Sequence, residues 1–437
     1  MLGLEIWFFM SSLLLKTPPL GLYIHLPWCV RKCPYCDFNS QARPTDPKAF
    51  TAYVEALIKE LDLTCELLEA QELKLLTNRP IRSVYFGGGT PSLFPPQELE
   101  RLFEALNLKL NLAADCEISM EANPGTVDLT SLKGYKALGV NRISLGIQSL
   151  NDGELKRLKR IHNRATALTA INDVASIFNN FNLDLMHSLP GQTTEMALAD
   201  LSAALAIKPP HLSWYQLTIE EDTAFGAQTP LDLPSEDTIE NTVVQGFKML
   251  EESSYKHYEV SAFAQPNHEC RHNVNYWRFG DYLALGAGAH SKFTLPDGIV
   301  RTSRVASPKA YMDGILKDSA PGVERGSLQK SALDLVNTSA FNLASVWAGT
   351  SHVRTWVEDC HVVPKEDLSF EYFLNRLRLF EAVPLAEFTA YTGLEMTKVM
   401  APLKRCIAEG LLNLEQDTLA ITPKGHLFVN AMLEEFL

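Results

Sequence analysis

Three cysteines near the start of the chain carry the clearest chemical signal. Cys29, Cys33 and Cys36 fall within the segment 23–38, YIHLPWCVRKCPYCDF. A [4Fe–4S] cluster takes one cysteine thiolate per iron, so three thiolates on one loop leave one iron open to another ligand. The alternative is a zinc site, but zinc ribbons repeat a Cys-x-x-Cys pair, and this sequence has no second pair. The spacing therefore favours an iron–sulfur cluster whose open iron can hold a substrate or cofactor.

The remaining thiols and the apolar start of the chain bear on location. An oxygen-sensitive cluster and unpaired thiols need a reducing compartment, which indicates that the protein is cytoplasmic. Within the cytoplasm, peripheral attachment to the inner face of the membrane is the alternative to a free protein. Residues 1–15 are apolar but shorter than the ~20 residues of a membrane span, so we expect an N-terminal extension, 1–17, that neither spans a membrane nor directs secretion; a misassigned start and a surface anchor are the alternatives. The other thiols are expected to be small buried residues without disulfides: Cys65, Cys116, Cys270, Cys360 and Cys406.

The composition indicates a folded protein that is poorly suited to nucleic acid. The 437 residues leave room for several domains, and 46% apolar residues suffice for a hydrophobic core. The formal net charge is -13, whereas nucleic acid is bound through clustered Lys and Arg. We therefore expect no nucleic-acid partner.

Strand-like and helical segments alternate from residue 22 onward. Parallel strands joined by helices curl into a partial barrel, and the series here predicts an α/β fold with a partial (β/α)6 barrel over 18–255. The predicted strands are 22–25, 83–86, 117–121, 142–147, 183–186 and 213–219. The predicted helices are 50–68, 96–108, 131–138, 165–178, 194–207 and 237–252.

Polar and glycine residues gather where these strands end. In such barrels the loops after the strands meet at one face, so these residues are expected to lie together. Gly87 to Gly89 would let the backbone approach a ligand closely, although three glycines are often just a turn. Glu121 could accept hydrogen bonds from ribose hydroxyls or a ligand ammonium, or it could be a structural carboxylate; Gln148 and Asp184 share that ambiguity.

A second region, 256–316, departs from the alternation and is expected to complete the core. It contains HNVNYW at 272–277. An imidazole beside Tyr and Trp suits a flat, iron-bearing ligand; a buried histidine in an aromatic cluster is the alternative. His272 is the candidate iron ligand, with His257, His268 and His290 nearby in the sequence.

The carboxyl-terminal part is predicted to be mainly helical. Helices over 370–381, 384–391 and 397–409, strands over 410–414 and 418–422 and a last helix after Pro423 predict a winged-helix-like domain, 369–437. Acidic residues offset its few basic ones, so we expect a packing or lid role instead of DNA binding. Residues 317–368 are expected to be a linker or insertion.

Several ordered motifs carry a resemblance to a known family. The cysteine spacing, with Tyr35 before the third cysteine, is similar to that of the radical S-adenosylmethionine (radical SAM) superfamily. Together the motifs resemble the HemW branch of the oxygen-independent coproporphyrinogen III oxidase family. They are the cysteine loop, YFGGGTPSL at 85–93, MEANPGT at 120–126, GVNRISLGIQS at 139–149, NLDLMH at 182–187, PHLSWYQLT at 210–218 and HNVNYW at 272–277.

The resemblance implies cofactors and the residues that hold them. Cys29, Cys33 and Cys36 would hold a [4Fe–4S] cluster, and SAM would be its fourth ligand and a source of the 5′-deoxyadenosyl radical. The implied SAM-binding residues are Tyr23, Tyr35, Gly88, Gly89, Thr90, Glu121, Gln148, Arg160 and Asp184. The implied heme-binding residues are His272, Asn273, Tyr276 and Trp277.

Two functions follow from the resemblance. The branch implies a heme chaperone that hands heme to apoproteins such as respiratory enzymes; the alternative is an oxygen-independent coproporphyrinogen III dehydrogenase. Phe38 occupies a position where the dehydrogenase branch has a further cysteine, and the chain lacks that branch's longer amino-terminal arm, so the chaperone is favoured. An RNA-modifying enzyme is disfavoured by the acidic balance. The motifs leave open whether the protein forms a homodimer and whether SAM cleavage is productive.

Overall fold

A computed structural model describes residues 15–69, 79–317, 340, 343–344, 347 and 355–437. The apolar start of the chain, 1–14, lies outside the described residues, so its role as an extension stays a prediction. The eight cysteines lie in the described residues and form no disulfide there, and four of the five outside the cluster loop are buried; Cys360 is half-buried. The sequence therefore anticipated the packing of these thiols closely.

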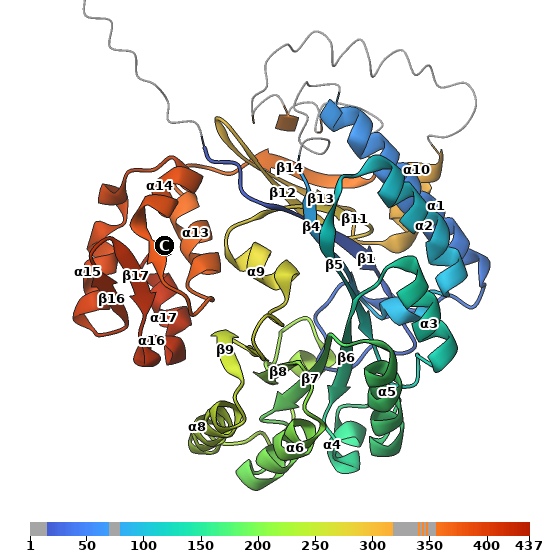
Figure 1. The fold of residues 1–437 in the computed structure, drawn as a ribbon, viewed down its shortest axis with the longest axis horizontal. Helices are drawn as coiled ribbons and strands as arrows, with labels where there is room; N and C mark the ends of the chain where they lie inside the picture. The colour runs from blue at the N-terminus through green and yellow to red at the C-terminus, as the bar shows by residue number, and fades with distance from the viewer. Residues whose placement is uncertain (1–14, 70–78, 318–339, 341–342, 345–346, 348–354) are drawn as a thin grey trace, which may run out of the picture.

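A 12-stranded sheet forms the centre of the molecule (Figure 1). Seven neighbouring strands are parallel, in the order β11-β1-β4-β5-β6-β7-β8. The six predicted strands are β1 (Leu20–Leu26), β4 (Ile81–Gly88), β5 (Leu112–Ala122), β6 (Arg142–Gln148), β7 (Phe181–His187) and β8 (His211–Gln216). The predicted partial barrel is thus confirmed, and β11 (Asp281–Leu285) extends it beyond β1.

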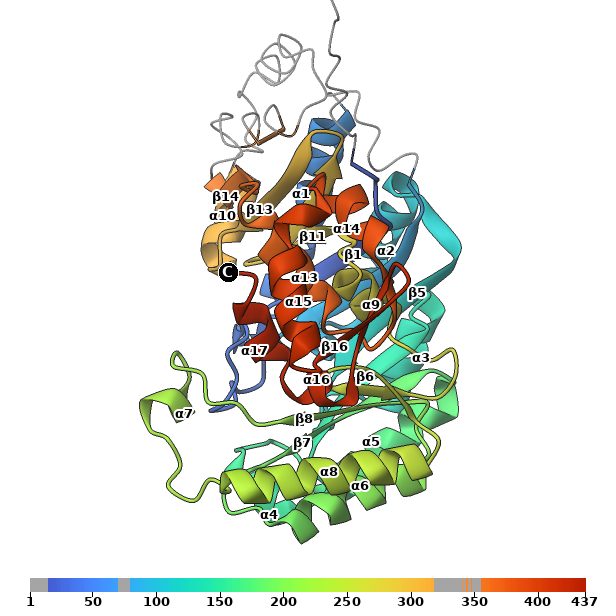
Figure 2. The same cartoon turned by 90° about the vertical axis from the view of Figure 1, so that its left-hand side faces the viewer.

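Helices cover the outer face of the parallel strands. Residues four apart form their apolar faces, and side-chain caps fix several starts: Asp128 accepts a hydrogen bond from the Ser131 amide at the start of α3, and Asn163 one from the Thr166 amide at the start of α5. In Figure 2, α6 and α8 lie side by side below the sheet, where they are in contact. The helices are α1 (Lys48–Glu69), α2 (Pro96–Lys109), α3 (Leu129–Leu138), α4 (Asp152–Arg157), α5 (Arg164–Ile177), α6 (Thr194–Ile207) and α8 (Glu236–Glu252). The short α7 (Ala224–Ala227) lies instead beside the cysteine loop, where the Phe225 amide donates to the Pro34 carbonyl oxygen. 

Antiparallel strands extend both edges of this sheet. β10 (Ala262–Ala264) and β9 (Lys256–Glu259) follow β8, while β12 (His290–Leu295), β13 (Gly298–Arg304) and β14 (Val357–Val362) follow β11. α9 (Arg271–Trp277) and α10 (Pro308–Lys317) complete this part, and a small sheet pairs β2 (Trp28–Cys29) with β3 (Gln41–Ala42). β14 arises from the predicted 317–368 insertion, whose boundaries stay a prediction.

The last part of the chain has its own hydrophobic core. Its elements are α13 (Leu368–Arg376), β15 (Val383–Pro384), α14 (Leu385–Thr392), the 3-10 turn Met396–Lys398, α15 (Met400–Ala408), β16 (Leu412–Glu415), β17 (Thr418–Ile421), α16 (Pro423–Leu427) and α17 (Val429–Glu434). The strands form a sheet in the order β15-β17-β16. The prediction of a mainly helical, winged-helix-like part is confirmed. The third strand, β15, was not predicted because it is only two residues long.

Ion pairs fasten this carboxyl-terminal part to the barrel. Arg278 Nε donates to Glu381 Oε1 at 2.8 Å, and Arg301 Nη2 to Glu371 Oε2 at 2.7 Å. A backbone bridge also joins Glu259 to Leu379. As a result, α9 lies between the carboxyl-terminal part and the open side of the parallel strands (Figure 1).

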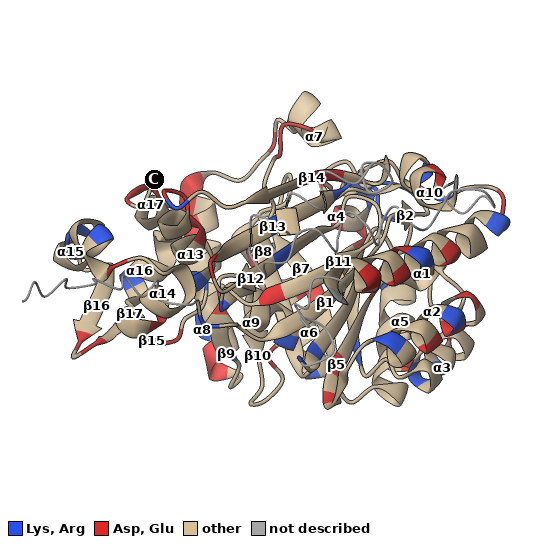
Figure 3. Cartoon of the chain, turned by 90° about the horizontal axis from the view of Figure 1, so that it is seen from above, with Lys and Arg blue, Asp and Glu red and all other residues tan. Residues whose placement is uncertain are grey.

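Charged residues of both signs are mixed over the outer helices. Lys and Arg alternate with Asp and Glu along α1 and α2 (Figure 3). Among the described residues, no helix is both long and apolar enough to cross a bilayer.

Candidate functional site

The cysteine loop follows β1 and is held by side chains from distant strands. Thr90 Oγ1 donates to Cys29 Sγ at 3.6 Å, and Arg160 Nη1 donates to Cys33 Sγ at 3.4 Å. Burial raises the pKa of the Cys29 and Cys36 thiols, so a bound metal would be needed to hold both as thiolates near neutrality. All three cysteines line one cavity.

The donor chemistry of this loop fits an iron–sulfur cluster. Three partly exposed thiols with hydrogen-bond donors beside their sulfurs are a soft ligand set of the kind that iron–sulfur clusters use. In the part of the chain that the structure describes, no three His, Cys, Asp or Glu side chains converge closely enough to hold a single ion. A cubane does not need that convergence, because each thiolate binds a different iron.

The glycine turn after β4 is tightly packed against the base of this loop. A Cβ atom on Gly89 would lie 2.7 Å from the Trp28 carbonyl oxygen, and one on Gly88 would lie 2.6 Å from the His25 ring. Gly88 also has a φ of +113°, which favours glycine. Glycine is therefore needed at these positions because the turn packs closely against the segment 25–28. The Gly88 amide also donates a hydrogen bond to Glu121 Oε2 at 3.2 Å.

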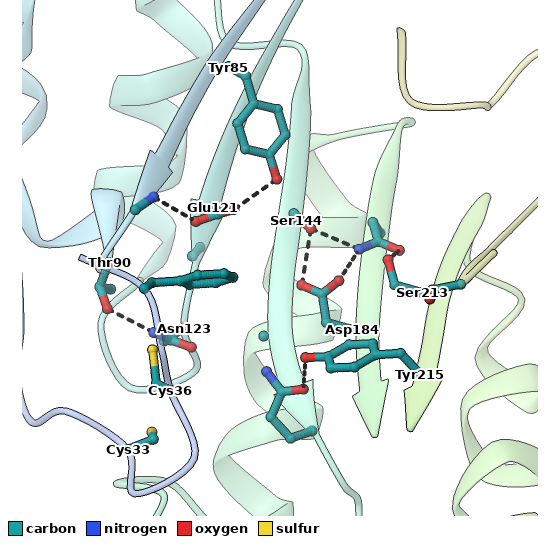
Figure 4. A pocket seen from close by; sticks show the side chains of 18 of the residues that line it. Cys33, Cys36, Tyr85, Thr90, Glu121, Asn123, Ser144, Asp184, Ser213 and Tyr215 are labelled. Atoms are coloured by element: carbon teal, nitrogen blue, oxygen red, sulfur yellow. Dashed lines mark hydrogen bonds between the residues drawn. The ribbon is translucent and has the colours of Figure 1, made fainter. Parts of the chain in front are cut away.

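Glu121 lies at the end of β5 and points into the cavity (Figure 4). Its Oε1 accepts a hydrogen bond from the Tyr85 hydroxyl at 2.9 Å. Burial raises the pKa of Glu121 to about 7, although the hydrogen bonds from Tyr85 and Gly88 oppose that shift. A carboxyl group that titrates near neutrality in a cavity is suited to meet a positively charged ligand group.

Polar side chains continue across β6, β7 and β8 on the same face. Asp184 accepts from Ser144 Oγ at 3.1 Å and from Asn182 Nδ2 at 2.7 Å, as Figure 4 shows. The Tyr215 hydroxyl donates to Gln148 Oε1 at 3.1 Å. Because residues two apart on a strand share a face, neighbouring strands in register bring these groups into one polar interior.

Arg160 connects this interior to the cysteine loop. Beyond Cys33, its guanidinium donates to the Gly146 carbonyl oxygen at 2.7 Å, to the Tyr35 hydroxyl at 3.4 Å and to Asn123 Oδ1. A single guanidinium thus fixes the loop, the end of β6 and the loop after β5 relative to one another. Its five donors suit this role, whereas a lysine could not span the same geometry.

The cavity itself has a volume of about 380 Å³, within the range of small-molecule sites. Eight of the nine predicted SAM-binding residues line it: Tyr35, Gly88, Gly89, Thr90, Glu121, Gln148, Arg160 and Asp184. Tyr23 lies behind this lining, where its hydroxyl bonds His25 Nδ1 at 3.0 Å and its ring stacks on Tyr85. 

The HNVNYW segment forms α9, and its two faces have different surroundings. Asn273 and Trp277, four residues apart, line the cavity. His272 and Tyr276, also four apart, face neighbouring aromatic rings: His272 stacks on Tyr85 with the ring centres 4.8 Å apart. This division follows from the helix, which places residues four apart on one face and turns about 100° per residue.

His272 is a neutral imidazole at physiological pH. Burial lowers its pKa to about 4, with the positive charge of Arg142 acting in the same direction. Its Nδ1 atom is buried and has no hydrogen-bond partner among the described residues. The other candidate histidines lie outside the cavity lining: His257 packs on Phe263, His268 is within reach of Asn180, and His290 is exposed.

Several cavity residues escaped sequence analysis. For those on β6, β7 and β8, the signal is polar residues recurring with a period of two inside strands that are otherwise apolar, as in Arg142, Ser144 and Gln148 of β6. The missed lining residues include Asn123, Arg142, Ser144, Asn182, His211, Ser213, Tyr215, Glu259, Cys270 and Arg378.

Comparisons with known proteins agree with this geometry. Residues 23–203 match the family model of the radical SAM superfamily, and residues 363–428 match the HemN C-terminal domain. The chain is 42% identical over 426 residues to the heme chaperone HemW of Escherichia coli, covering 97% of this chain and all of the relative, and 42% identical over 425 residues to that of Haemophilus influenzae, covering 97% and 99%.

A solved structure supports the fold independently. The coproporphyrinogen III oxidase HemN of Escherichia coli, a radical SAM enzyme, superposes with a TM-score of 0.73 over 96% of this chain and 90% of its own, at 21% identity. That likeness concerns the fold alone. The near-complete match to the curated relatives shows that the chain belongs to the HemW family, within the radical SAM superfamily.

Proposed function

We propose that this protein is a heme chaperone, which binds heme and delivers it to apoproteins such as respiratory enzymes. Relatives that match almost the whole chain bear that name. The observation that carries the proposal is that one cavity connects the cysteine loop with the Asn273 and Trp277 face of α9. Phe38, in place of a further cysteine, argues against coproporphyrinogen dehydrogenase activity as the alternative.

The cysteine end of the cavity is proposed to hold the [4Fe–4S] cluster and SAM. Cys29, Cys33 and Cys36 would ligate three irons, and Thr90 and Arg160 would donate hydrogen bonds to the ligating sulfurs. When bound, the cluster and SAM supply one-electron radical chemistry. 

Glu121 is proposed to receive the positively charged amino group of SAM. The Glu121 carboxylate already accepts a hydrogen bond from the Gly88 amide, so the same carboxylate would bind both the glycine turn and the ligand. Gln148, Arg160 and Asp184 surround the same space, and Tyr23 supports it from behind through its stacking on Tyr85.

The α9 end is proposed to bind heme. His272 is kept neutral, so its imidazole is available to iron across the physiological range. Because its ring stacks against Tyr85 outside the cavity lining, iron ligation requires a rotation of the His272 side chain or a shift of α9. Asn273, Tyr276 and Trp277 would contact the porphyrin.

The test is an anaerobic titration of the full chain after cluster reconstitution. Hemin is added to the wild type, to His272→Ala and to the control His361→Ala, which replaces an exposed histidine on β14, while coproporphyrinogen turnover is assayed in parallel. Stoichiometric hemin binding that only His272→Ala weakens, by about 10-fold or more, without turnover, is the expected result. Turnover without specific hemin binding would make the protein an oxidase.

We further infer a cytoplasmic protein, with peripheral contact to the membrane where membrane-bound apoproteins receive heme. We also propose that the protein forms a homodimer. Light scattering of the reconstituted protein distinguishes a mass near 48.7 kDa from twice that value. 

A further inference from the structure

Arg142 is a buried cation that faces the far end of the cavity. It is the first residue of β6, only 2% exposed, and it lines the cavity together with Ser144, Gly146 and Gln148. Residues two apart on a strand share a face, and six residues of strand span about 20 Å. Arg142 therefore lies at the opposite end of β6 from Gln148, which belongs to the cysteine end.

The guanidinium of Arg142 has no partner within the described part of the chain. No ion pair within 4.0 Å and no hydrogen bond involves it there, and its Nε atom is completely buried. Glu117 is the nearest carboxylate in the adjoining strand, but its Oε1 accepts hydrogen bonds from the Arg271 amide at 2.9 Å and from Ser119 at 3.4 Å. Glu117 and Asp184 act on the guanidinium electrostatically but do not contact it, so a ligand anion that did so would stabilise this buried charge.

Neighbouring groups add further unused donors. Trp277 Nε1 lines the same cavity, is buried and has no hydrogen-bond partner among the described residues. The guanidinium of Arg378 lies over the Trp277 ring, 5.3 Å from its centre. Glu259 also faces this end, but burial raises its pKa to about 7, so near neutrality it carries only part of a negative charge.

We propose that Arg142 and Trp277 form a carboxylate-binding subsite at the far end of the cavity, which anchors a propionate of a bound tetrapyrrole. This proposal rests on the proposed function, because heme supplies the propionates. The methionyl carboxylate of SAM has the same chemistry and is the other source. The place of Arg142 at the opposite end of β6 from Gln148, beyond Ser144, which pairs with Glu121, favours the propionate, because SAM is expected to lie next to the cluster.

The test compares ligands with and without the carboxylate in the reconstituted full chain. Hemin and hemin dimethyl ester, in which both propionates are esterified, are titrated into wild type, Arg142→Met, Arg142→Lys, Trp277→Phe and the control Arg101→Met, an exposed arginine on α2. SAM and 5′-methylthioadenosine, which lacks the carboxylate, form a second pair. Thermal unfolding without ligand is recorded for every variant.

The subsite predicts a specific pattern. The wild type is expected to bind hemin about 10- to 100-fold more tightly than its dimethyl ester, because a hydrogen bond to a charged group contributes a free energy of this size. Arg142→Met loses this preference for the free propionates, and Arg142→Lys retains part of it. Trp277→Phe reduces hemin affinity several-fold and Arg101→Met changes nothing. Without ligand, each variant shows one cooperative unfolding transition, so the losses of affinity do not come from unfolding.

Other outcomes separate the proposals. Loss of SAM affinity in Arg142→Met, with methylthioadenosine unaffected, would retain the subsite and assign it to SAM. Hemin binding and SAM binding that are both equal in wild type and Arg142→Met would overturn the subsite and leave the heme proposal standing. If the wild type binds no hemin, the proposed function fails; unchanged SAM affinity in Arg142→Met would then overturn the subsite as well.

Discussion

The two ends of the cavity were encoded in the sequence in different ways. At the cysteine end, motif residues lie in the carboxyl-terminal parts of parallel strands or on the loops that follow them, and nearly all of them face the cavity. At the α9 end, the motif is one short helix, and only Asn273 and Trp277 face the cavity, while His272 and Tyr276 pack on aromatic rings. The comparison teaches that a motif on strand-end loops predicts one shared site, whereas a motif on a helix is divided by the helical period.

The ends also differ in how their polar groups are satisfied. Around the cysteines, hydrogen bonds join Arg160 to Asn123, Asn123 to Thr90 and Thr90 to Cys29, and among these groups only Arg160 Nε is buried without a partner in the described part of the chain. Around α9, Arg142 Nε, His272 Nδ1 and Trp277 Nε1 are buried without partners among the described residues. The first end is preorganised by the protein itself, and the second has donors left for a ligand.

The largest effect is expected from loss of the cluster, which should change the cysteine end and leave hemin binding at the α9 end nearly unchanged. Cys33→Ala should abolish iron and sulfide incorporation, because two thiolates cannot retain a cubane with an open iron. Hemin affinity at the far end should change less than about threefold, as expected for sites that share no contacts. Iron and sulfide assays and a hemin titration measure both, with the half-buried Cys360→Ser as the control. A cluster retained in Cys33→Ala would contradict the assignment.

The two buried carboxyl groups provide the next comparison, one at each end. Glu121 and Glu259 both have a pKa raised by burial to about 7, so each stabilises the fold below about pH 4.5 and loses that contribution as pH rises through 7. Glu259→Gln should therefore match the wild type at low pH and exceed its free energy of unfolding at pH 8 by on the order of 2 to 4 kcal/mol.

Glu121→Gln should gain less than Glu259→Gln at pH 8. An amide has only one acceptor oxygen, so it gives up either the Tyr85 or the Gly88 hydrogen bond that the carboxylate accepts. Urea unfolding at a series of pH values measures both variants. Equal gains would show that the Glu121 hydrogen bonds contribute nothing to stability.

The two faces of α9 can be separated by a matched pair of substitutions. Trp277→Ala removes an aromatic group from the cavity lining and should weaken hemin binding about 10-fold, the equivalent of 1 to 2 kcal/mol of apolar contact. Tyr276→Ala, on the packing face against Tyr282, should lower thermal stability and change hemin affinity less. Equal losses of affinity would mean that the motif binds as a unit after α9 rearranges.

The smallest effect is expected in the electronic properties of the cysteine end. Arg160→Met removes the hydrogen bond to Cys33 Sγ, which stabilises the reduced, more negative cluster. Its reduction potential should fall by about 40 mV, the equivalent of roughly 1 kcal/mol for one electron. Redox titration followed by electron paramagnetic resonance measures this, with Arg157→Met, which is paired with Asp232 away from the cysteines, as the control. An unchanged potential would exclude a tuning role.

Sequence analysis anticipated most of the fold but only part of the cavity. The alternation of strands and helices predicted the six β/α units because each element has a characteristic period. β11 was missed because its strand signal lies in a region that breaks the alternation, and its pairing with β1 joins residues more than 250 positions apart. Arg142 was missed because a single arginine in a strand does not reveal whether an anion faces it.

By itself, the sequence determined the family of the protein and predicted the chemistry of the cysteine loop, since long ordered motifs and three closely spaced thiols are local properties of the chain. Only the tertiary structure decided which residues share the cavity, which face of α9 borders it and that Arg142 is buried without a partner. Those facts depend on strand register and on the packing of α9 between the barrel and the carboxyl-terminal part, and both arise from contacts between residues far apart in the sequence.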